Sequence, residues 1–430
     1  MDEWKDVKLS EIADVQTGPF GSQLHMEDYV ERGTPIVTVE HLGNREFSSQ
    51  NLPRVTDTDK ERLQKYILKT GDVVFSRVGS VDRCSYVSEK ENGWMFSGRC
   101  LRIRAIDSTV EPLYLYYYFT SESIKQIIRS IAVGATMPSI NTSILSGIPV
   151  SLPPLPEQKR IAHILGTLDD KIELNRRMNA TLEAMARALF KSWFVDFDPV
   201  RAKIDGRKPE GLDSETAALF PSHFEHGEHG QIPVGWKSVP ITDVCAINDW
   251  SLGKSDRLTT IEYIEISEVS SGNISNIATY SRGEEPSRAR RRLRHGDTII
   301  STVRPDRGSY CLALNPPKNR IASTGFAVLT PTKAPWSFVH AAMTLPDLFD
   351  HLGQMADGGA YPAVRPDVIG AWNIILPDNQ HVLAAYHHVC APLYEMAEVN
   401  RLQSRKLSDI RDTLLPKLLN GTISTTERKL

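Results

Sequence analysis

The chain has 430 residues, of which 40% are hydrophobic and 24% are charged, and its formal net charge is −3. This ordinary globular composition leaves room for two or three hydrophobic cores and excludes a wholly disordered chain. An acidic chain attracts DNA phosphates weakly, so nucleic-acid binding requires local clusters of Lys and Arg or basic partners.

The cysteines and the hydropathy indicate a cytoplasmic protein. No apolar run reaches the roughly 20 residues of a membrane span, and residues 1–15 are too acidic and polar for a signal peptide. The cysteines are odd in number and never spaced as CxxC, which disfavours both a disulfide framework and a structural zinc site. They are Cys84, Cys100, Cys245, Cys311 and Cys390.

Residues 1–154 contain the pattern of a mixed globular domain. Apolar runs predict short strands over 34–40, 71–76 and 100–104. Residues 111–130 have helical spacing and many aromatic side chains. Such a tyrosine cluster could stack on unpaired bases, but aromatic residues at helical spacing more often form core, and core is the favoured interpretation.

A long helix is predicted over residues 155–197. A Pro-rich hinge at 152–156 precedes it, and no further Pro occurs before Pro199. An apolar seven-residue repeat keeps one side of a helix facing a partner helix, and about 30 such residues make a rod of roughly 45 Å. Gly166 indicates that the first turns form a separate short helix. The repeat consists of Ile161, Leu168, Asn175, Leu182 and Leu189.

Residues 198–235 are predicted to be a linker, because Asp, Gly, Pro and His are frequent and periodicity is absent. His223, His226 and His229 have metal-like spacing. They lack cysteine partners and have no counterpart in the first half, so a solvated loop is favoured over a zinc site.

The second half repeats this order. A globular domain is predicted over 236–377, a second helix over 378–421 and a tail over 422–430. Pro392 is expected to kink this helix or to begin its long section, while Pro416 and Asn420-Gly421 mark its end. The second seven-residue repeat consists of Tyr386, Leu393, Asn400, Leu407 and Leu414.

Further landmarks recur in the same order, which indicates a tandem duplication. Trp4 and Trp236 differ by 232 positions, and Gly134 and Gly358 by 224. The two helices are therefore each other's expected partners, with an Asn in each seam fixing their register. The other pairs are Gly71-Asp72 with Gly296-Asp297, Asp82-Arg83 with Asp306-Arg307, and Leu152-Pro153 with Leu376-Pro377.

Basic residues recur just before the Gly-Asp pair of each half. Five arginines fall within residues 288–294, and the first half has Lys60, Arg62, Lys65 and Lys69 in the equivalent stretch. Arginine pairs bidentately with phosphate and with guanine edges. Phosphate contact and a merely solvated face remain equally open.

Each half also has a strand that leads into a basic loop, at 76–83 and 301–307. Such loops could carry Arg77 and Arg304 into a major groove. Arg83 and Arg307 each follow an aspartate, so a pair that braces the turn is an equal alternative for them.

No catalytic signature is present. Residues 315–318 (NPPK) are similar to the Asn-Pro-Pro-aromatic loop of amino-methyltransferases, but Lys318 stands where the aromatic ring is needed, so a surface turn is favoured. No Ser-His-Asp order, Walker loop or HExxH motif occurs. The chain is expected to have no active site of its own.

A family resemblance is carried by residues 134–169, in which GATMPSI leads to LPPLPEQ and a helix. This stretch, residues 17–22 (TGPFGS), 71–77 (GDVVFSR) and 414–421 (LLPKLLNG) resemble the specificity subunit of type I restriction-modification enzymes. The second half departs from the pattern where residues 378–381 (DNQH) replace Pro-Leu-x-Glu-Gln and Thr302 replaces the arginine.

The resemblance implies an α+β chain of two target-recognition domains of mixed sheet with helices, separated by two conserved helices in an antiparallel coiled coil with pseudo-twofold symmetry. Each domain would read one half of a bipartite, asymmetric site in double-stranded DNA. The candidate DNA-binding residues are Thr17, Ser22, Arg77, Arg83, Thr136, Ser139, Arg288, Arg291, Arg304, Arg307 and Tyr361.

The resemblance also implies partners. Two adenine-N6 methyltransferase subunits carrying S-adenosylmethionine would dock on the helices, and ATP- and Mg-dependent motor-nuclease subunits would complete the complex. No cofactor or metal is expected on this chain. The alternatives are a methyltransferase or nuclease complete in one chain, and a coiled-coil scaffold without sequence readout.

Overall fold

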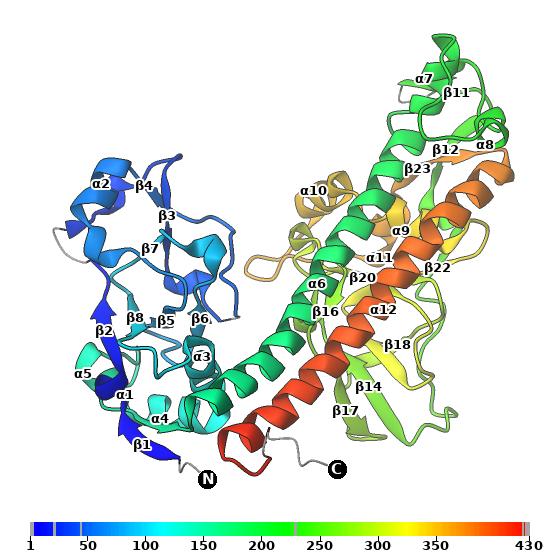
Figure 1. Cartoon of the computed structure of the whole chain (residues 1–430). Helices are drawn as coiled ribbons and strands as arrows, with labels where there is room; N and C mark the ends of the chain where they lie inside the picture. The colour runs from blue at the N-terminus through cyan, green and yellow to red at the C-terminus, as the bar shows by residue number, and fades with distance from the viewer. Residues whose placement is uncertain (1–3, 20–22, 44, 228–229, 424, 426–430) are drawn as a thin grey trace, which may run out of the picture. The chain divides into compact units, whose positions relative to one another are not determined.

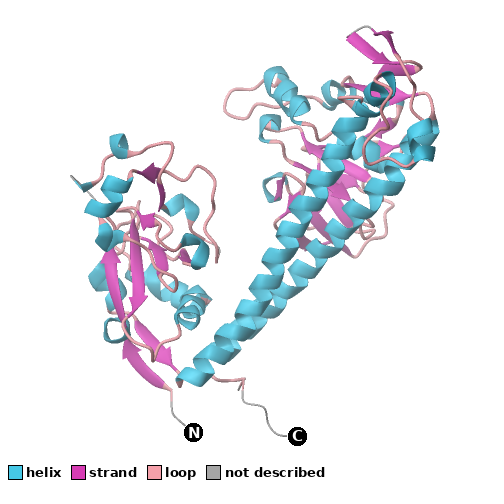
Figure 2. Cartoon of the chain, turned by 45° about the horizontal axis from the view of Figure 1, so that its top comes forward, coloured by secondary structure: helices cyan, strands magenta, loops and turns pink. Residues whose placement is uncertain are grey.

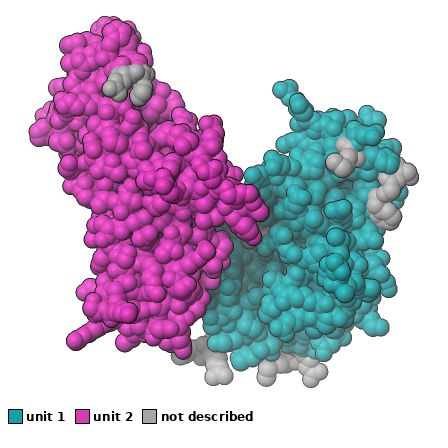
Figure 3. Space-filling model, turned by 180° about the vertical axis from the view of Figure 1, so that it is seen from behind, with its two compact units in different colours: residues 1–174, 403–430 teal, residues 175–402 magenta. Residues whose placement is uncertain are grey.

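The computed structural model describes residues 4–19, 23–43, 45–227, 230–423 and 425 (Figure 1). It divides into two compact units, drawn in different colours in Figure 3. Unit 1 combines residues 1–174 with 403–430, and unit 2 spans residues 175–402. Each unit therefore contains one globular domain and a segment of both long helices.

The main sheet of unit 1 is antiparallel, with the strand order β2-β8-β5-β6. Val, Phe, Ile and Leu side chains fill both faces of its central strands, which are buried. A smaller sheet, β4-β3-β7, pairs β3 and β7 in parallel, and β1 pairs with β9. The strands are β1 (Lys5–Lys8), β2 (Ala13–Thr17), β3 (Thr34–Val37), β4 (Arg54–Val55), β5 (Val73–Ser76), β6 (Cys84–Tyr86), β7 (Met95–Phe96), β8 (Cys100–Ala105) and β9 (Pro149–Leu152).

Helices cover the main sheet of unit 1. The segment 111–130 forms two helices rather than one, because Ser121 has extended dihedrals and its hydroxyl donates to the Tyr118 carbonyl at 2.8 Å. Tyr114 and Tyr117 are almost fully buried, which confirms the prediction that the tyrosine cluster is core. The helices are α1 (Leu9–Ile12), α2 (Asp57–Arg62), α3 (Pro112–Thr120), α4 (Glu122–Ile131) and α5 (Thr142–Ser146).

Unit 2 repeats this topology. Its sheet β13-β22-β19-β20 matches β2-β8-β5-β6 in order and direction, β14 and β21 form the parallel pair, and β12 pairs with β23. The duplication read from the sequence is thus a duplication of the fold. The strands are β12 (Trp236–Pro240), β13 (Cys245–Ile247), β14 (Thr260–Ile264), β15 (Val269–Ser270), β16 (Asn273–Ile274), β17 (Ala278–Ser281), β18 (Ala289–Arg292), β19 (Asp297–Ser301), β20 (Tyr310–Ala313), β21 (Arg320–Ser323), β22 (Phe326–Pro331) and β23 (Asn373–Pro377).

Unit 2 contains the helices α9 (Trp336–Ala342), α10 (Pro346–Met355) and α11 (Pro366–Gly370). Of these, α10 corresponds to α4 of unit 1, and α11 corresponds to α5. Figure 2 shows the helices and strands of both units in separate colours. Among the described residues, no helix combines the length and apolar character that crossing a membrane requires.

The predicted linker 198–235 is folded, so that prediction was wrong. It contains α7 (Asp198–Ile204), α8 (Ser214–Ala218) and the hairpin of β10 (Phe224–Gly227) with β11 (Gly230–Pro233). The segment is ordered because Phe220 packs into the core of unit 2, together with Phe197 and Trp236 at its two borders. The aromatic side chains in and beside this segment are spaced irregularly, so the sequence has no periodicity there that would predict a folded segment.

The long helices are α6 (Leu155–Phe194) and α12 (Gln380–Leu419), and both are uninterrupted. The expected break at Gly166 is absent. A Cβ there would meet Leu113 Cδ2 at 3.2 Å, so glycine lets α6 pack closely on α3. Pro392 and Pro416 also lie within α12, and both are exposed, so water can solvate the carbonyl groups that these prolines leave unpaired.

Both helices complete the core of each unit. In unit 1, Ile161 of α6 and Leu418 of α12 belong to the cluster beneath the main sheet. Asp169 accepts hydrogen bonds from Tyr117 and Arg411, both at 2.7 Å, and so links α3, α6 and α12. In unit 2, Phe190 and Tyr386 pack edge to face in the largest cluster.

An asparagine network joins α6 and α12 within unit 2. Asn175 and Asn400 are 0% and 5% exposed, and Asn175 Nδ2 donates to the Asn400 carbonyl at 3.3 Å. Asn400 Nδ2 donates to Asn179 Oδ1, and Asn179 Nδ2 to the Ala397 carbonyl, both at 2.9 Å. Contacts that run 175 to 400 and 186 to 386 make the helices antiparallel.

The apolar members of the two seven-residue repeats are less uniformly enclosed than the asparagines. Ile161 is fully buried, whereas the leucines are half-buried. The half-buried members are Leu168, Leu182, Leu189, Leu393, Leu407 and Leu414.

The aspartate of the Gly-Asp turn lies beside an arginine of β8 in unit 1 and beside a threonine of β22 in unit 2. Asp72 is 0% exposed and accepts two hydrogen bonds of 2.7 Å from Arg104. In unit 2 the register places Thr330 where Arg104 stands, and Asp297 is 1% exposed. Burial raises the pKa of Asp297 to about 6, although the Arg294 backbone N–H donates to it at 2.6 Å.

The asparagine network predicts a non-additive response to substitution. Asn400→Leu removes the donor to buried Asn179 Oδ1, so we expect the free energy of unfolding to fall by about 1–3 kcal/mol. Replacing Asn175, Asn179 and Asn400 together by Leu should recover that loss and loosen the helix register. Urea unfolding measures both changes, with Ala184→Leu, at an exposed position of α6, as the control. Additive losses would contradict a shared network.

Asp297 predicts a pH-dependent stability. Because its folded pKa exceeds the value of an unfolded aspartate, its contribution to stability is complete below pH ~4 and is lost as pH rises through about 6. Asp297→Asn should therefore raise the free energy of unfolding at pH 7.5 by about 1–3 kcal/mol and have little effect near pH 4. Thermal unfolding across this range tests it. An equal effect at both pH values would contradict it.

Candidate nucleic-acid interface

In unit 1 two loops are joined by backbone hydrogen bonds. The loop that follows β5 begins at Arg77, and the second loop, the tip loop of residues 133–140, begins after α4. Ile140 N donates to the Arg77 carbonyl at 2.9 Å, and Gly79 N donates to the Pro138 carbonyl at 2.8 Å. Val133 and Ser139 exchange hydrogen bonds of 2.9 and 2.8 Å that close the tip loop.

Unit 2 builds the same pair of loops. Val364 N donates to the Thr302 carbonyl at 2.9 Å, and Arg304 N donates to the Pro362 carbonyl at 2.7 Å. Asp357 and Ala363 close the second tip loop, residues 357–364, with hydrogen bonds of 3.1 and 2.8 Å. Arg304 thus occupies the position of Gly79. The loop after β5 and the loop after β19 therefore carry their arginine at different positions.

Arg77 and Arg304 are both half-buried at the base of a tip loop. Arg77 Nη1 donates to the Gly98 carbonyl at 3.3 Å. Arg304 has left-handed backbone dihedrals, its Nη2 donates to the Ala360 carbonyl at 2.9 Å, and its guanidinium lies 4.9 Å from the centre of the Tyr361 ring. Both side chains are held in place before any ligand arrives.

The sequence left open an ion pair between Asp82 and Arg83 that would stabilise the turn, but each of these side chains has another partner. Asp82 instead accepts from Arg129 of α4 at 2.5 Å, and Arg83 donates to the Leu42 carbonyl. Arg83 therefore braces a neighbouring loop through its guanidinium. Arg307 is exposed in the short 3-10 helix Pro305–Arg307.

The remaining candidates of unit 1 lie in varied settings. Thr17 ends β2, and no described residue accepts or donates a hydrogen bond at its half-buried hydroxyl. Thr136 is exposed on the tip loop, where the Ser139 hydroxyl donates to the Val133 carbonyl at 3.2 Å. Ser22 lies outside the described residues.

The arginine cluster of unit 2 is partly structural. Arg292 pairs with Asp256 at 2.5 Å and Arg294 with Asp249 at 2.8 Å, and both guanidinium groups lie over the Trp250 ring. Arg291 is half-buried, and desolvation lowers its pKa. Of the candidates from this stretch, Arg288 is exposed. Arg288 is therefore better placed than Arg291 to contact a phosphate.

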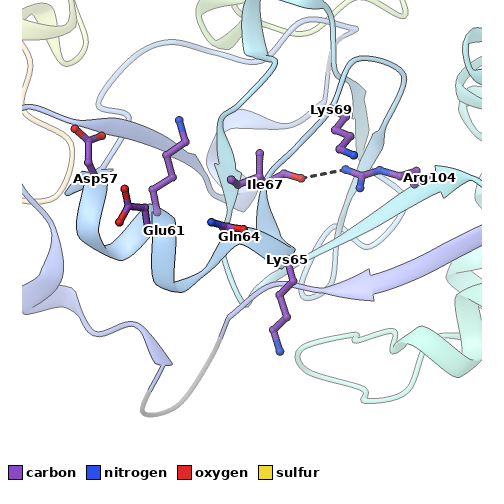
Figure 4. A pocket seen from close by; sticks show the side chains of 8 residues that line it. Asp57, Glu61, Gln64, Lys65, Ile67, Lys69 and Arg104 are labelled. Atoms are coloured by element: carbon purple, nitrogen blue, oxygen red, sulfur yellow. Dashed lines mark hydrogen bonds between the residues drawn. The ribbon is translucent and has the colours of Figure 1, made fainter.

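The equivalent lysines of unit 1 line a cavity of about 630 Å³ beside α2 (Figure 4). Arg104 closes one side, and its Nη2 donates to the Ile67 carbonyl at 3.0 Å. Asp57 and Glu61 share the rim, so the cavity has mixed charge. The basic residues around it are Lys60, Lys65, Lys69 and Arg104.

The described residues contain no cluster of three or more side chains arranged to hold a metal ion. The five cysteines are buried thiols, and burial raises the pKa of Cys84, Cys100 and Cys245 to about 12, which makes them poor nucleophiles. His223 and His226 lie on or beside the β10–β11 hairpin, and His229 lies outside the described residues.

Comparison with known proteins shows the fold and the proteins that this chain resembles. Residues 1–184 match the family described as type I restriction modification DNA specificity domain. The HindI specificity subunit of Haemophilus influenzae is 24% identical over 98% of this chain and 100% of its own length, and the MjaIX specificity subunit of Methanocaldococcus jannaschii is 23% identical over 99% and 94%. The chain is therefore similar over nearly its whole length to type I restriction enzyme specificity subunits, and its first 184 residues match their DNA specificity domain.

The crystal structure of a specificity subunit from M. genitalium has the same fold, with a TM-score of 0.58, 15% identity and coverage of 97% of this chain and 96% of that one. The expected fold class of two mixed domains with a pair of long antiparallel helices is confirmed. A role as a non-catalytic component of a type I restriction enzyme agrees with these relatives, which are specificity subunits.

The sequence analysis did not select Met137. It is 68% exposed on the first tip loop, at the place that Tyr361 occupies on the second. The aligned motifs GATMPSI and GGAYPAV already put the two residues in register. Only Tyr361 was selected, because an aromatic ring suggests base stacking and a methionine suggests core.

Proposed function

We propose that this specificity subunit reads a bipartite, asymmetric site in double-stranded DNA, one half-site with each unit. The supporting observation is that both units present the same pair of hydrogen-bonded loops with an arginine fixed at the base, while the side chains on the loops differ. Identical scaffolds with different surfaces suit the reading of two different half-sites.

The chain's acidity is compatible with this function if contacts are local. Arg77, Arg304 and Arg288 are available near the loops, and neighbouring side chains or carbonyls hold the first two in place. Base readout needs only a few such side chains, whereas phosphate contacts set overall affinity and its dependence on salt. Basic partner subunits would provide the rest.

The helix pair supports docking of two methyltransferase subunits. On α12, the side that faces the domain core carries Cys390 and Tyr394, whereas exposed apolar residues recur on other positions of both helices. Exposed apolar residues that cluster on a helix pair mark an interaction surface. In unit 2 they are Met178, Met185, Val389, Met396, Val399 and Leu402, with exposures of 38, 50, 44, 49, 59 and 44%.

In this assembly the chemistry belongs to the partners. The methyltransferase subunits would bind S-adenosylmethionine and transfer its methyl group to adenine N6, and motor-nuclease subunits would use ATP and Mg. This chain would position the DNA. An isolated chain that methylated DNA would support the rival view of a complete enzyme.

The readout assignment predicts separate effects of two substitutions. In the complex reconstituted with its methyltransferase subunits, Arg77→Glu should weaken recognition of one half-site and Arg304→Glu recognition of the other, each by about tenfold or more. Mapping methylated adenines first defines the site, and binding to duplexes altered in each half then separates the effects. Arg207→Glu, exposed on the segment after α7, is the control. Unchanged binding by both variants at equal thermal stability would contradict the assignment.

The docking assignment predicts loss of assembly without loss of folding. Met396→Glu combined with Met185→Glu should reduce binding of a methyltransferase subunit by about tenfold or more. The reason is that both side chains would be buried against that subunit in the complex, where a charge is unfavourable. Sedimentation of the mixed subunits without DNA measures this. Ile204→Glu introduces the same charge at an exposed apolar position of α7 and should leave assembly intact. Normal assembly by the double variant would contradict the assignment.

A further inference from the structure

The two tip loops present the most exposed large apolar side chains of the described residues. Tyr361 is 71% exposed and Met137 is 68% exposed. They lie 224 positions apart, the offset that also relates Gly134 to Gly358. Leaving a large apolar side chain in water is unfavourable, and here it occurs twice at one place in a duplicated fold.

The backbone beneath each tip is built to present that residue. Gly134 and Gly358 have φ values of 107° and 116°, and a Cβ added there would meet the tip residue's own carbonyl oxygen at 2.8 and 3.2 Å. A proline follows each tip, and its carbonyl accepts from the loop after the central strand. Each tip is therefore a braced projection, which lowers the entropy lost on binding.

Within the tip loops themselves, the shared apolar feature is a single side chain in each unit. Ile131 and Met355, which end the preceding helices α4 and α10 and are 38% and 51% exposed, lie outside the loops. Val133 is 64% exposed next to the first tip, but its counterpart in unit 2 is Asp357. A protein partner usually covers a contiguous apolar patch. A lone apolar projection with an arginine at its base better matches insertion between base pairs, where neighbouring phosphates attract the cation.

We propose that Met137 and Tyr361 are wedge residues, each inserting between base pairs of its own half-site and partly unstacking one step. This inference rests on the proposed reading of duplex DNA and adds how the DNA is deformed. Tyr361 can stack its ring on a base, with Arg304 on the ring's other face at 4.9 Å. Met137 fills the opened step with a flexible thioether side chain.

Deformation would add selectivity at positions that no side chain reads. Flexible pyrimidine–purine steps open more easily than A-tracts or G·C-rich steps, so a wedge favours half-sites with a flexible step at the insertion point. A ring and a thioether differ in stacking strength, so the two half-sites should depend on their wedges to different degrees.

The test uses duplexes that carry 2-aminopurine, whose fluorescence increases when it is unstacked, at each purine position other than the methylated adenine. The complex of the full chain with its methyltransferase subunits should raise the fluorescence at one step in each half-site. Tyr361→Ala should abolish the rise in one half-site only, and Met137→Ala in the other only, whereas Tyr361→Phe should retain it.

Affinity gives a second readout. Tyr361→Ala should weaken binding by about fivefold to a hundredfold, the range expected for one lost base–aromatic stack. Ile106→Ala, which removes an apolar side chain of 56% exposure from unit 1 away from the tip loop, should change neither readout.

Two results would overturn the wedge. One is undiminished fluorescence with Tyr361→Ala and Met137→Ala in complexes that still bind and methylate the site. The other is loss of subunit assembly without DNA in either variant, which would make the tip a protein contact. Absence of sequence-specific binding by the unaltered complex would instead refute the proposed DNA reading itself.

Discussion

The structure depends on the antiparallel packing of α6 and α12, because neither globular domain can complete its core without both helices. Unit 1 takes Ile161 from one helix and Leu418 from the other, and unit 2 takes Phe190 and Tyr386. Segments 257 positions apart in unit 1 and 196 positions apart in unit 2 must therefore meet before either core is closed. The buried asparagines restrict the register in which they meet, since only one alignment satisfies their amides.

Duplication allows one chain to present two similar surfaces whose details have diverged. The backbone hydrogen bonds of the tip loops are the same in both units, yet Thr302 replaces Arg77, and Arg304 replaces Gly79. Divergence also reaches the core, where Thr330 stands in the position of Arg104 and leaves the Asp297 carboxyl with a raised pKa. Backbone hydrogen bonds tolerate such exchanges because they do not involve the side chains.

Much of the fold could be predicted from the sequence, and the errors share a cause. Repeats, seams and the tyrosine core follow from residue type and spacing, which act locally. Gly166 was read as a boundary between two helices, and Pro392 as a kink or the start of the long section, because their intrinsic preferences disfavour helix. The helices α6 and α12 nevertheless continue through both residues, which packing on α3 at Gly166 and solvent exposure at Pro392 allow. A pair of Arg83 with its neighbour Asp82 was one of two equal alternatives, and it fails because Arg129, distant in sequence, takes that carboxylate.

The sequence by itself determined the duplication, the two long helices, the asparagines at their centres and the resemblance to specificity subunits, because each follows from the order and period of residues. Only the tertiary structure decided which arginines brace and which stand at the tip loops, that Asn179 joins the network, and that Met137 and Tyr361 project into solvent. Exposure and partner choice depend on what the rest of the chain places nearby, and spacing along one chain does not contain that information.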